Sequence, residues 1–359
     1  VQTVDVSGIN NLASGTYTGS LSDMFAGDSK LTTINGMNNW KPLTGVDRTE
    51  GMFSGDESLN SDTFSLPSAF KGLSYNDNDF DKMFNDTGLT SIDLSNLGLN
   101  NSNNSKQFNV NLANMLSNNK KLGTVSGLGD VSDVTSMAQM YYDDPSLTTA
   151  TFGDTGNGGT AKVTDFHQMF NNDSKLSTIN NFNSASFVAA QDMSKMFDGD
   201  SKLGSLNFGA SGQQETGNLS NVSSMFANMG TALNGIQGLG DLDFSNVTDM
   251  DHMFANDQPV NTGITLPDLS GISTASATDM SGMFQNDGHV NNANFNIYNF
   301  NTNNLKNFGT SDVTKDGDTG MFQGTTFNQI QTGGNLRLDH NADLYVYAGA
   351  DGNFGLPSG

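Results

Sequence analysis

Residues 23–34 read DMFAGDSKLTTI, and two later stretches repeat this order: QMFNNDSKLSTI at 168–179 and KMFDGDSKLGSL at 195–206. Each has a methionine before an aromatic residue, an aspartate four residues after the methionine, and a leucine and a second large apolar residue beyond it. Self-similarity at a period of about 20 to 50 residues is typical of repeat architectures, in which a unit too small to fold alone stacks on its neighbours. The fold therefore depends on how such units stack.

The methionine-aromatic pair marks the units along the chain. It occurs at Met24-Phe25, Met52-Phe53, Met83-Phe84, Met140-Tyr141, Met169-Phe170, Met196-Phe197, Met225-Phe226, Met253-Phe254, Met283-Phe284 and Met321-Phe322, with Met115-Leu116 as a degenerate copy. Successive methionines are 25 to 38 residues apart, which is the length of one supersecondary unit. The spacing predicts a solenoid of about eleven short coils.

The local pattern predicts the content of each coil. An apolar residue three positions before most of the methionines makes M-x-x-M-F suitable for one face of a short helix, and upstream threonines and aspartates suit a helix start. Alternating runs at 91–97, 205–209 and 293–300 have a period of two and indicate short strands. We expect a helix, a turn and a strand in each coil, with the Met and Phe side chains in a shared core.

The two ends of the chain lack the pattern. Residues 1–20 are expected to form an N-terminal cap, and 325–359 a C-terminal β cap with a hairpin in NLRLDHNADLYVYAG at 335–349. The solenoid is then 21–324. Insertions rich in Gly, Asn and Ser at 100–106, 153–161 and 209–217 are expected as surface loops.

Three copies carry the repeat most fully: DVTSMAQMY at 133–141, NVTDMDHMF at 246–254 and SATDMSGMF at 276–284. In this pattern, which runs from about Leu21 to Phe295, the chain resembles the leucine-rich repeats of BspA-like bacterial surface proteins, particularly those of lactobacilli and related Gram-positive bacteria. The resemblance implies an α/β leucine-rich-repeat-like solenoid and a secreted adhesin of the cell wall. The opening at Val1 and the ending GLPSG lead us to expect a fragment whose export and anchoring signals lie outside it.

Composition limits the expected partners. The formal net charge is −23, and so acidic a surface repels nucleic acid and anionic lipid because it offers no basic patch. The chain has no cysteine, which excludes disulfides, thiolate metal sites and a cysteine nucleophile. It has no apolar run of about 18 residues. Neither nucleic-acid binding nor direct membrane insertion is expected.

Aspartates recur four residues after the methionine, at Asp28, Asp56, Asp144, Asp173, Asp200, Asp257 and Asp287. In a solenoid they would stack at roughly 4.8 Å, where ionised carboxylates repel one another. We expect each to accept backbone N–H groups at a turn, and to stay ionised in acid for that reason. A Ca²⁺ ladder is the alternative, but it needs several oxygens per ion and no D-x-D-x-D-G loop is present. No cofactor is expected.

Catalytic patterns are weak, whereas aromatic residues suggest ligand binding. The four histidines show no H-x-x-x-H spacing, and G-x-S-x-G and G-x-x-x-x-G-K-[ST] are absent. Flat aromatic faces beside Asn and Asp acceptors suit sugars. The candidate ligand-binding residues are Trp40, Tyr141, Tyr142 and Tyr298, with the packing of Trp40 over the first coil as the alternative.

The expected function is that of a non-enzymatic cell-surface adhesin that binds host or matrix glycans or proteins. The alternative is homotypic association, as in cell aggregation or biofilm, because carboxylates that repel at pH 7 become neutral donors as the pH falls toward their ordinary pKa of about 4. An enzyme that cleaves polysaccharides is disfavoured, since no acid pair is set in an apolar environment.

Overall fold

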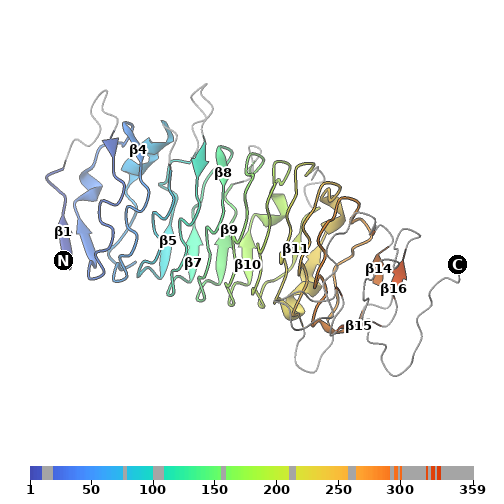
Figure 1. Cartoon of the computed structure of the whole chain (residues 1–359). Helices are drawn as coiled ribbons and strands as arrows, with labels where there is room; N and C mark the ends of the chain where they lie inside the picture. The colour runs from blue at the N-terminus through green and yellow to red at the C-terminus, as the bar shows by residue number, and fades with distance from the viewer. Residues whose placement is uncertain are drawn as a thin grey trace, which may run out of the picture. The chain divides into compact units, whose positions relative to one another are not determined.

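The computed structural model describes residues 1–9, 19–75, 79–99, 109–154, 159–209, 216–257, 264–291, 295–297, 300, 321, 325–327 and 330–332. The described chain is a parallel β-solenoid built from strands of two or three residues (Figure 1). It divides into two compact units, Val1–Ala190 and Gln191–Gly359. The expected solenoid is confirmed, but the expected eleven helix-containing coils are wrong, because the part of the chain that the structure describes forms about seven turns with few helices.

The described residues of the first unit form ten strands: β1 (Thr3–Asp5), β2 (Gly19–Ser20), β3 (Thr33–Asn35), β4 (Val46–Arg48), β5 (Ser91–Asp93), β6 (Val110–Asn111), β7 (Thr124–Ser126), β8 (Val134–Ser136), β9 (Thr149–Thr151) and β10 (Thr178–Asn180). Its largest sheet has the order β10-β9-β7-β5, and three smaller sheets join β1 to β3, β2 to β4 and β6 to β8. All of these pairs are parallel, as expected when each strand returns after a whole repeat. The middle residues Ile92 and Val125 are buried, whereas Ser91 and Thr124 are exposed.

The second unit pairs β11 (Leu206–Asn207) with β12 (Ile236–Gln237), β13 (Gly288–Val290) with β15 (Thr325–Phe327), and β14 (Phe295–Ile297) with β16 (Ile330–Thr332). The strands expected within 91–97, 205–209 and 293–300 are confirmed by β5, β11 and β14. At the C-terminal end β15 and β16 pair in parallel with earlier strands, and the hairpin expected at 335–349 lies outside the described residues.

Helical structure in the described residues consists of 3₁₀ turns. They are η1 (Met37–Asn39), η2 (Ser68–Tyr75), η3 (Phe182–Ser184), η4 (Gly230–Gly235) and η5 (Leu239–Asp241). Within the described part of the chain, none of these helices has the length and apolarity needed to cross a membrane.

The methionine-aromatic segments, which the sequence predicts as helices, are turns. The residue before the methionine has a positive φ, 56° at Lys82 and 53° at Gln168, and so does the residue three after it, 79° at Gly27 and 68° at Asn172. A left-handed residue with a Cβ costs about 1–2 kcal/mol and cannot continue a right-handed helix. The predicted helices are therefore wrong, because the apolar spacing is equally compatible with this turn.

Backbone hydrogen bonds join successive methionine-aromatic turns. The N–H of the aromatic residue donates to the methionine carbonyl of the next copy, from Phe25 to Met52 at 3.0 Å and from Phe53 to Met83 at 2.9 Å. The same bond recurs in the second unit, where Phe226 donates to Met253 at 2.9 Å. The copies are held in register at this turn, so differences in repeat length are taken up in the loops.

The Met and Phe side chains fill the core, as predicted. Phenyl rings stack in columns, with centroids 5.5 Å apart for Phe25 and Phe53 and 5.2 Å apart for Phe53 and Phe84. In the second unit the rings of Phe226, Phe254 and Phe284 continue this arrangement at 5.7 and 5.5 Å. Such ring pairs contribute about 0.5–1.5 kcal/mol each beyond the burial of their area.

Candidate functional site

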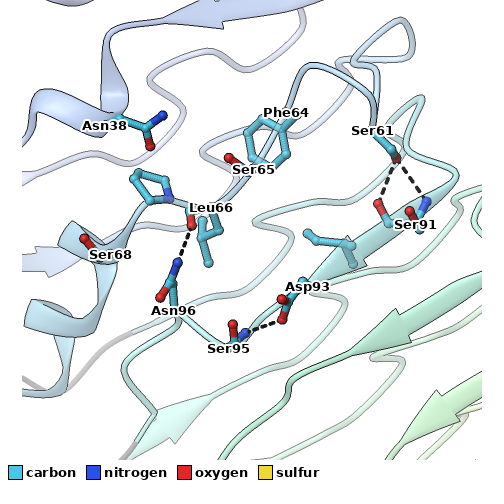
Figure 2. Close-up of a pocket in the computed structure, with 12 residues that line it drawn as sticks. Asn38, Ser61, Phe64, Ser65, Leu66, Ser68, Ser91, Asp93, Ser95 and Asn96 are labelled. Atoms are coloured by element: carbon cyan, nitrogen blue, oxygen red, sulfur yellow. Dashed lines mark hydrogen bonds between the residues drawn. The ribbon is translucent and has the colours of Figure 1, made fainter.

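A polar pocket of about 330 Å³ lies in the first unit beside β5, the edge strand of the four-stranded sheet (Figure 2). Three segments line it: Asn38 in η1, residues 61–68 ahead of and at the start of η2, and residues 91–96, which include β5. The pocket therefore brings together parts of the chain that are more than one repeat apart.

The pocket exists because strand pairing stops at β5. The preceding copy has SDTFSLPSAF at 61–70 where a strand would pair, and Pro67 has no N–H to offer a sheet. Ser61 replaces part of that strand, since its hydroxyl accepts the N–H of Thr90 at 2.9 Å and of Ser91 at 3.0 Å and donates to the Ser91 carbonyl at 2.8 Å. Within the lining, the Asn96 amide donates to the Leu66 carbonyl at 2.7 Å (Figure 2).

The lining suits a ligand rich in hydroxyl groups. Asn38, Ser65 and Ser68 are exposed, and within the described part of the chain their side chains make no hydrogen bond. Asp93 is the one charged residue among the described lining residues, and it accepts the N–H of Ser95 at 2.9 Å. Phe64 is buried and supplies an apolar wall. Amide, hydroxyl and carboxylate groups over an apolar surface are the usual elements of a small-molecule site.

The aromatic residues predicted to bind ligands do not line this pocket. Trp40 is only 6% exposed, and its ring stacks on Phe70 with centroids 6.3 Å apart. Tyr141 is fully buried, its hydroxyl donates to the Thr151 carbonyl at 3.0 Å, and burial raises its pKa strongly. Tyr142 is half-buried, and Tyr298 lies outside the described residues. The interpretation of Trp40 and Tyr141 as exposed platforms is wrong, because both rings pack inside the solenoid.

The repeated aspartates and their equivalents form what we call the carboxyl ladder: Asp28, Asp56, Asn119, Asp144 and Asp173 in the first unit, and Asp200, Asp257 and Asp287 in the second. Apart from Asp28 their side chains are buried. A side-chain oxygen accepts the N–H of the preceding copy, as Asp56 Oδ1 does from Asp28 at 2.9 Å and Asp144 Oδ1 from Asn119 at 2.6 Å. In the second unit Asp287 Oδ1 accepts the N–H of Asp257 at 3.1 Å. The side chains thus bind backbone amides of the turn.

Burial controls the protonation of this ladder. It raises the pKa of Asp56 to about 7, with a smaller effect from the nearby charge of Asp28. Burial also raises the pKa of Asp144, Asp257 and Asp287 well above the ordinary value, and the Asp287 carboxylate raises that of Asp257 further. The accepted N–H bonds lower these pKa values, but desolvation outweighs them. The expectation that the ladder stays ionised in acid is therefore wrong.

Neither histidine chemistry nor a metal cluster forms a second centre in the described residues. His252 contacts the Asp251 carboxylate through Nδ1 and lies 3.0 Å from Gln285 Oε1 through Nε2, and its pKa is raised chiefly by the bond to Asp251. Within the ranges that the structure describes, no three His, Cys, Asp or Glu residues are grouped so as to hold a metal ion.

Asn38, Ser65 and Ser68 line the pocket but are not among the site residues predicted from the sequence. A signal was present in SDTFSLPSAF, where a proline and four serines or threonines interrupt the position at which a strand is expected. That substitution predicts an unpaired sheet edge. It does not reveal that η1 would supply the opposite wall of the pocket.

Comparison with known proteins places the repeat in a family. A leucine-rich repeat protein from Bacteroides ovatus ATCC 8483 is similar over 69% of this chain and 54% of its own chain, with 12% identity and a TM-score of 0.27, so that this chain spans about half of its length. No curated protein matches the sequence. The sequence model described as "Mycoplasma protein of unknown function, DUF285" matches overlapping segments at 15–110, 78–205, 110–234, 146–266 and 220–333. Because these matches extend over most of the sequence, the chain belongs to the DUF285 family.

Proposed function

We propose that the chain is a non-enzymatic binding module, the extracellular part of a cell-surface adhesin related to the BspA-like proteins of lactobacilli and other Gram-positive bacteria. The observation that carries the proposal is the pocket beside β5, where Asn38, Ser65 and Ser68 present unengaged polar groups around an apolar wall. A host or matrix glycan, free or attached to a protein, has the hydroxyl groups that these side chains recognise.

Charge narrows the class of glycan. The formal net charge of the chain is −23, and the pocket itself contains the Asp93 carboxylate. Sulfated or carboxylated sugars would be repelled by both. A neutral oligosaccharide is therefore the expected ligand.

The test is a titration of the chain with neutral and sulfated oligosaccharides at pH 7. Asn38→Ala and Ser68→Ala each remove a polar group from the pocket, and Ser174→Ala is a matched control because Ser174 is exposed and outside the lining. We expect saturable binding of a neutral glycan that weakens about 10-fold in the pocket variants, the effect of roughly 1.4 kcal/mol, and is unchanged in the control. Equal affinity in all variants contradicts the proposal.

Acid-promoted association between copies of the chain is the second candidate. In the second unit Asp192, Asn221, Asp249 and Asp279 are joined by successive parallel bridges, which places three acidic side chains and one amide at equivalent positions of neighbouring copies. Burial raises the pKa of Asp249, and the carboxylates of Asp279, Asp251 and Asp192 raise it further. As the pH falls, the Asp249 carboxylate is therefore protonated at a higher pH than an ordinary aspartate.

Light scattering distinguishes the two candidates. Association predicts particle growth as the pH falls from 7 to 4, and Asp249→Asn should move its onset to higher pH because a charge is already absent. Constant particle size over this range contradicts association, whereas particle growth without binding to any glycan contradicts the adhesin.

A further inference from the structure

Four positions equivalent to the ladder are occupied by residues that are not acids, namely Thr87, Asn119, Met229 and Thr325. Two of them, Asn119 and Thr325, donate a hydrogen bond to the preceding copy. The Asn119 amide donates to the carbonyl of Phe84 at 2.9 Å and also to that of Leu116. The Thr325 hydroxyl, four residues after Met321, donates to the carbonyl of Phe284. Phe84 and Phe284 both directly follow a repeat methionine. The buried position therefore contains a carbonyl acceptor that faces the ladder side chain.

These two side chains also accept a backbone N–H. Asn119 Oδ1 accepts the N–H of Thr87 at 2.7 Å, and Thr325 Oγ1 accepts the N–H of Asp287 at 2.9 Å. Each side chain thus accepts from one backbone group of the preceding copy and donates to another. In these two copies the requirement at this position is for one acceptor and one donor, whereas Thr87 donates to Asn119 Oδ1 of the following copy at 2.7 Å and Met229 is apolar.

The ladder aspartates fulfil the accepting half of this requirement with Oδ1. Their second oxygen, Oδ2, is buried and has no hydrogen-bond partner in Asp56, Asp144, Asp257 and Asp287. Asn119 uses its second atom, Nδ2, as the donor. An ionised carboxylate cannot donate, and its oxygen beside a carbonyl oxygen would be repelled, whereas a protonated carboxyl has an O–H group for that acceptor.

We propose that the buried ladder acids Asp56, Asp144, Asp257 and Asp287 are neutral carboxylic acids at pH 6, and that each Oδ2–H donates to the carbonyl of the residue after the repeat methionine of the preceding copy. The folded chain then carries protons as structural components. A protonated carboxyl group can accept one N–H and donate to one carbonyl, as the Asn119 amide and the Thr325 hydroxyl do.

The charges around the ladder favour the neutral form. In the described part of the chain, the charged groups that act on these acids are themselves acidic: Asp28 on Asp56, Asp143 on Asp144, and Asp287 and Asp198 on Asp257. The buried Tyr141 hydroxyl also lies near Asp144 and Asp173, and their charges raise its pKa. Ionising one acid therefore adds a like charge to an already acidic surrounding.

The direction of the pH dependence follows from the raised pKa. The unfolded chain releases these protons near pH 4, at the ordinary Asp pKa of about 3.9, whereas the folded chain keeps them. The stability contributed by the ladder is fully present below about pH 4 and is lost as the pH rises through the folded pKa, which is about 7 for Asp56. The ladder thus opposes the usual loss of stability in acid.

A matched pair of variants tests the proposal by urea unfolding of the full chain at pH 4, 6 and 8. Asp257→Asn supplies a neutral donor of the same shape, so we expect the unfolding midpoint of the variant to equal that of wild type at pH 4 and to exceed it at pH 8. Asp268→Asn is the control, since Asp268 is exposed and accepts the N–H of Ser270 at 2.9 Å. An Asp257→Asn midpoint below that of wild type at pH 8 overturns the proposal.

A second measurement needs no variant. Infrared spectra of the native chain at pH 6 should show the carbonyl band of protonated carboxyl groups, and this band should vanish when the chain is unfolded by urea at the same pH. Unfolding in weakly buffered solution should also release protons. A native spectrum without that band, or unfolding without proton release, overturns the proposal regardless of how any variant folds.

Discussion

The Ser61 hydroxyl lies 2.8 Å from the Ser91 carbonyl oxygen, to which it donates, and it accepts the N–H groups of Thr90 and Ser91 at 2.9 and 3.0 Å. One side chain therefore occupies the edge of β5 that a neighbouring strand would otherwise pair. Without this hydroxyl, the two N–H groups would lose their acceptor.

Ser61→Ala should lower the free energy of unfolding by about 1–3 kcal/mol, the cost of leaving such groups unsatisfied. Urea unfolding measures it. Ser58→Ala is the control, because the Ser58 hydroxyl makes a single exposed bond, to the Ser29 carbonyl at 2.7 Å. Equal losses in the two variants would contradict the role assigned to Ser61.

Phe84→Ala should lower the free energy of unfolding by about 3–5 kcal/mol, the usual cost of deleting a buried phenyl ring. Phe84 is fully buried, stacks on Phe53 at 5.2 Å and meets the edge of Phe64 at 5.9 Å between ring centroids. Since Phe64 lines the pocket, glycan affinity should fall as well. Phe84→Leu should cost less on both measurements, and a loss below about 1 kcal/mol for Phe84→Ala would contradict the stacked core.

Ser224→Gly should raise the free energy of unfolding by about 0.5–1 kcal/mol, because glycine adopts left-handed backbone without steric cost. Ser224 has a φ of 53°, and glycine already stands before the methionine at Gly51 and Gly282, with φ of 59° and 58°. Chemical denaturation measures the difference. Ser223, next to it, has no positive φ, so Ser223→Gly should lower the free energy of unfolding by a similar amount. A lower free energy of unfolding in both variants would contradict backbone strain at Ser224.

Asn119→Asp should place an acid where the ladder now has an amide. If that position requires a donor, the variant should match wild type at pH 4 and unfold at lower urea concentration at pH 8, because the new carboxyl group must keep its proton to replace the bond to Phe84. Asn246→Asp is the control, since the exposed Asn246 amide donates to the Gly217 carbonyl at 2.7 Å. A loss independent of pH would contradict the expectation.

Part of the fold could be predicted from the sequence because burial follows residue type. Met83 and Phe84 recur at a fixed phase with apolar partners, and both are buried. The left-handed residue before the methionine could not be read off, since that position is occupied by Lys82 in one copy and Gln168 in another. The position three after the methionine, however, is always Gly, Asn or Asp, the residue types that tolerate a positive φ. That regularity indicates a turn.

The candidate site could not be predicted in the same way, since it depends on which strand is missing. Asn38 and Ser65 gain a role only because β5 has no strand partner on one side. Trp40 stands among polar residues, which favours an exposed side chain. The ring that covers it belongs to Phe70, 30 residues further along the chain, and reaches Trp40 only because the copies stack. The protonation of the ladder is likewise set by three-dimensional burial, of which an aspartate in a sequence gives no sign.

The hydrogen bonds between methionine-aromatic turns all run in one direction, from Phe25 to Met52 and from Phe53 to Met83. If the copy that contains Met52 were deleted, the N–H of Phe25 in the copy before it could donate to the carbonyl of Met83 in the copy after it, which is the same kind of bond. Gene duplication or deletion can therefore change the array by whole copies and leave the N–H and carbonyl groups of this turn paired. The number of copies then sets the length of the repeat array, and evolution can change that length without changing the residues that line a pocket.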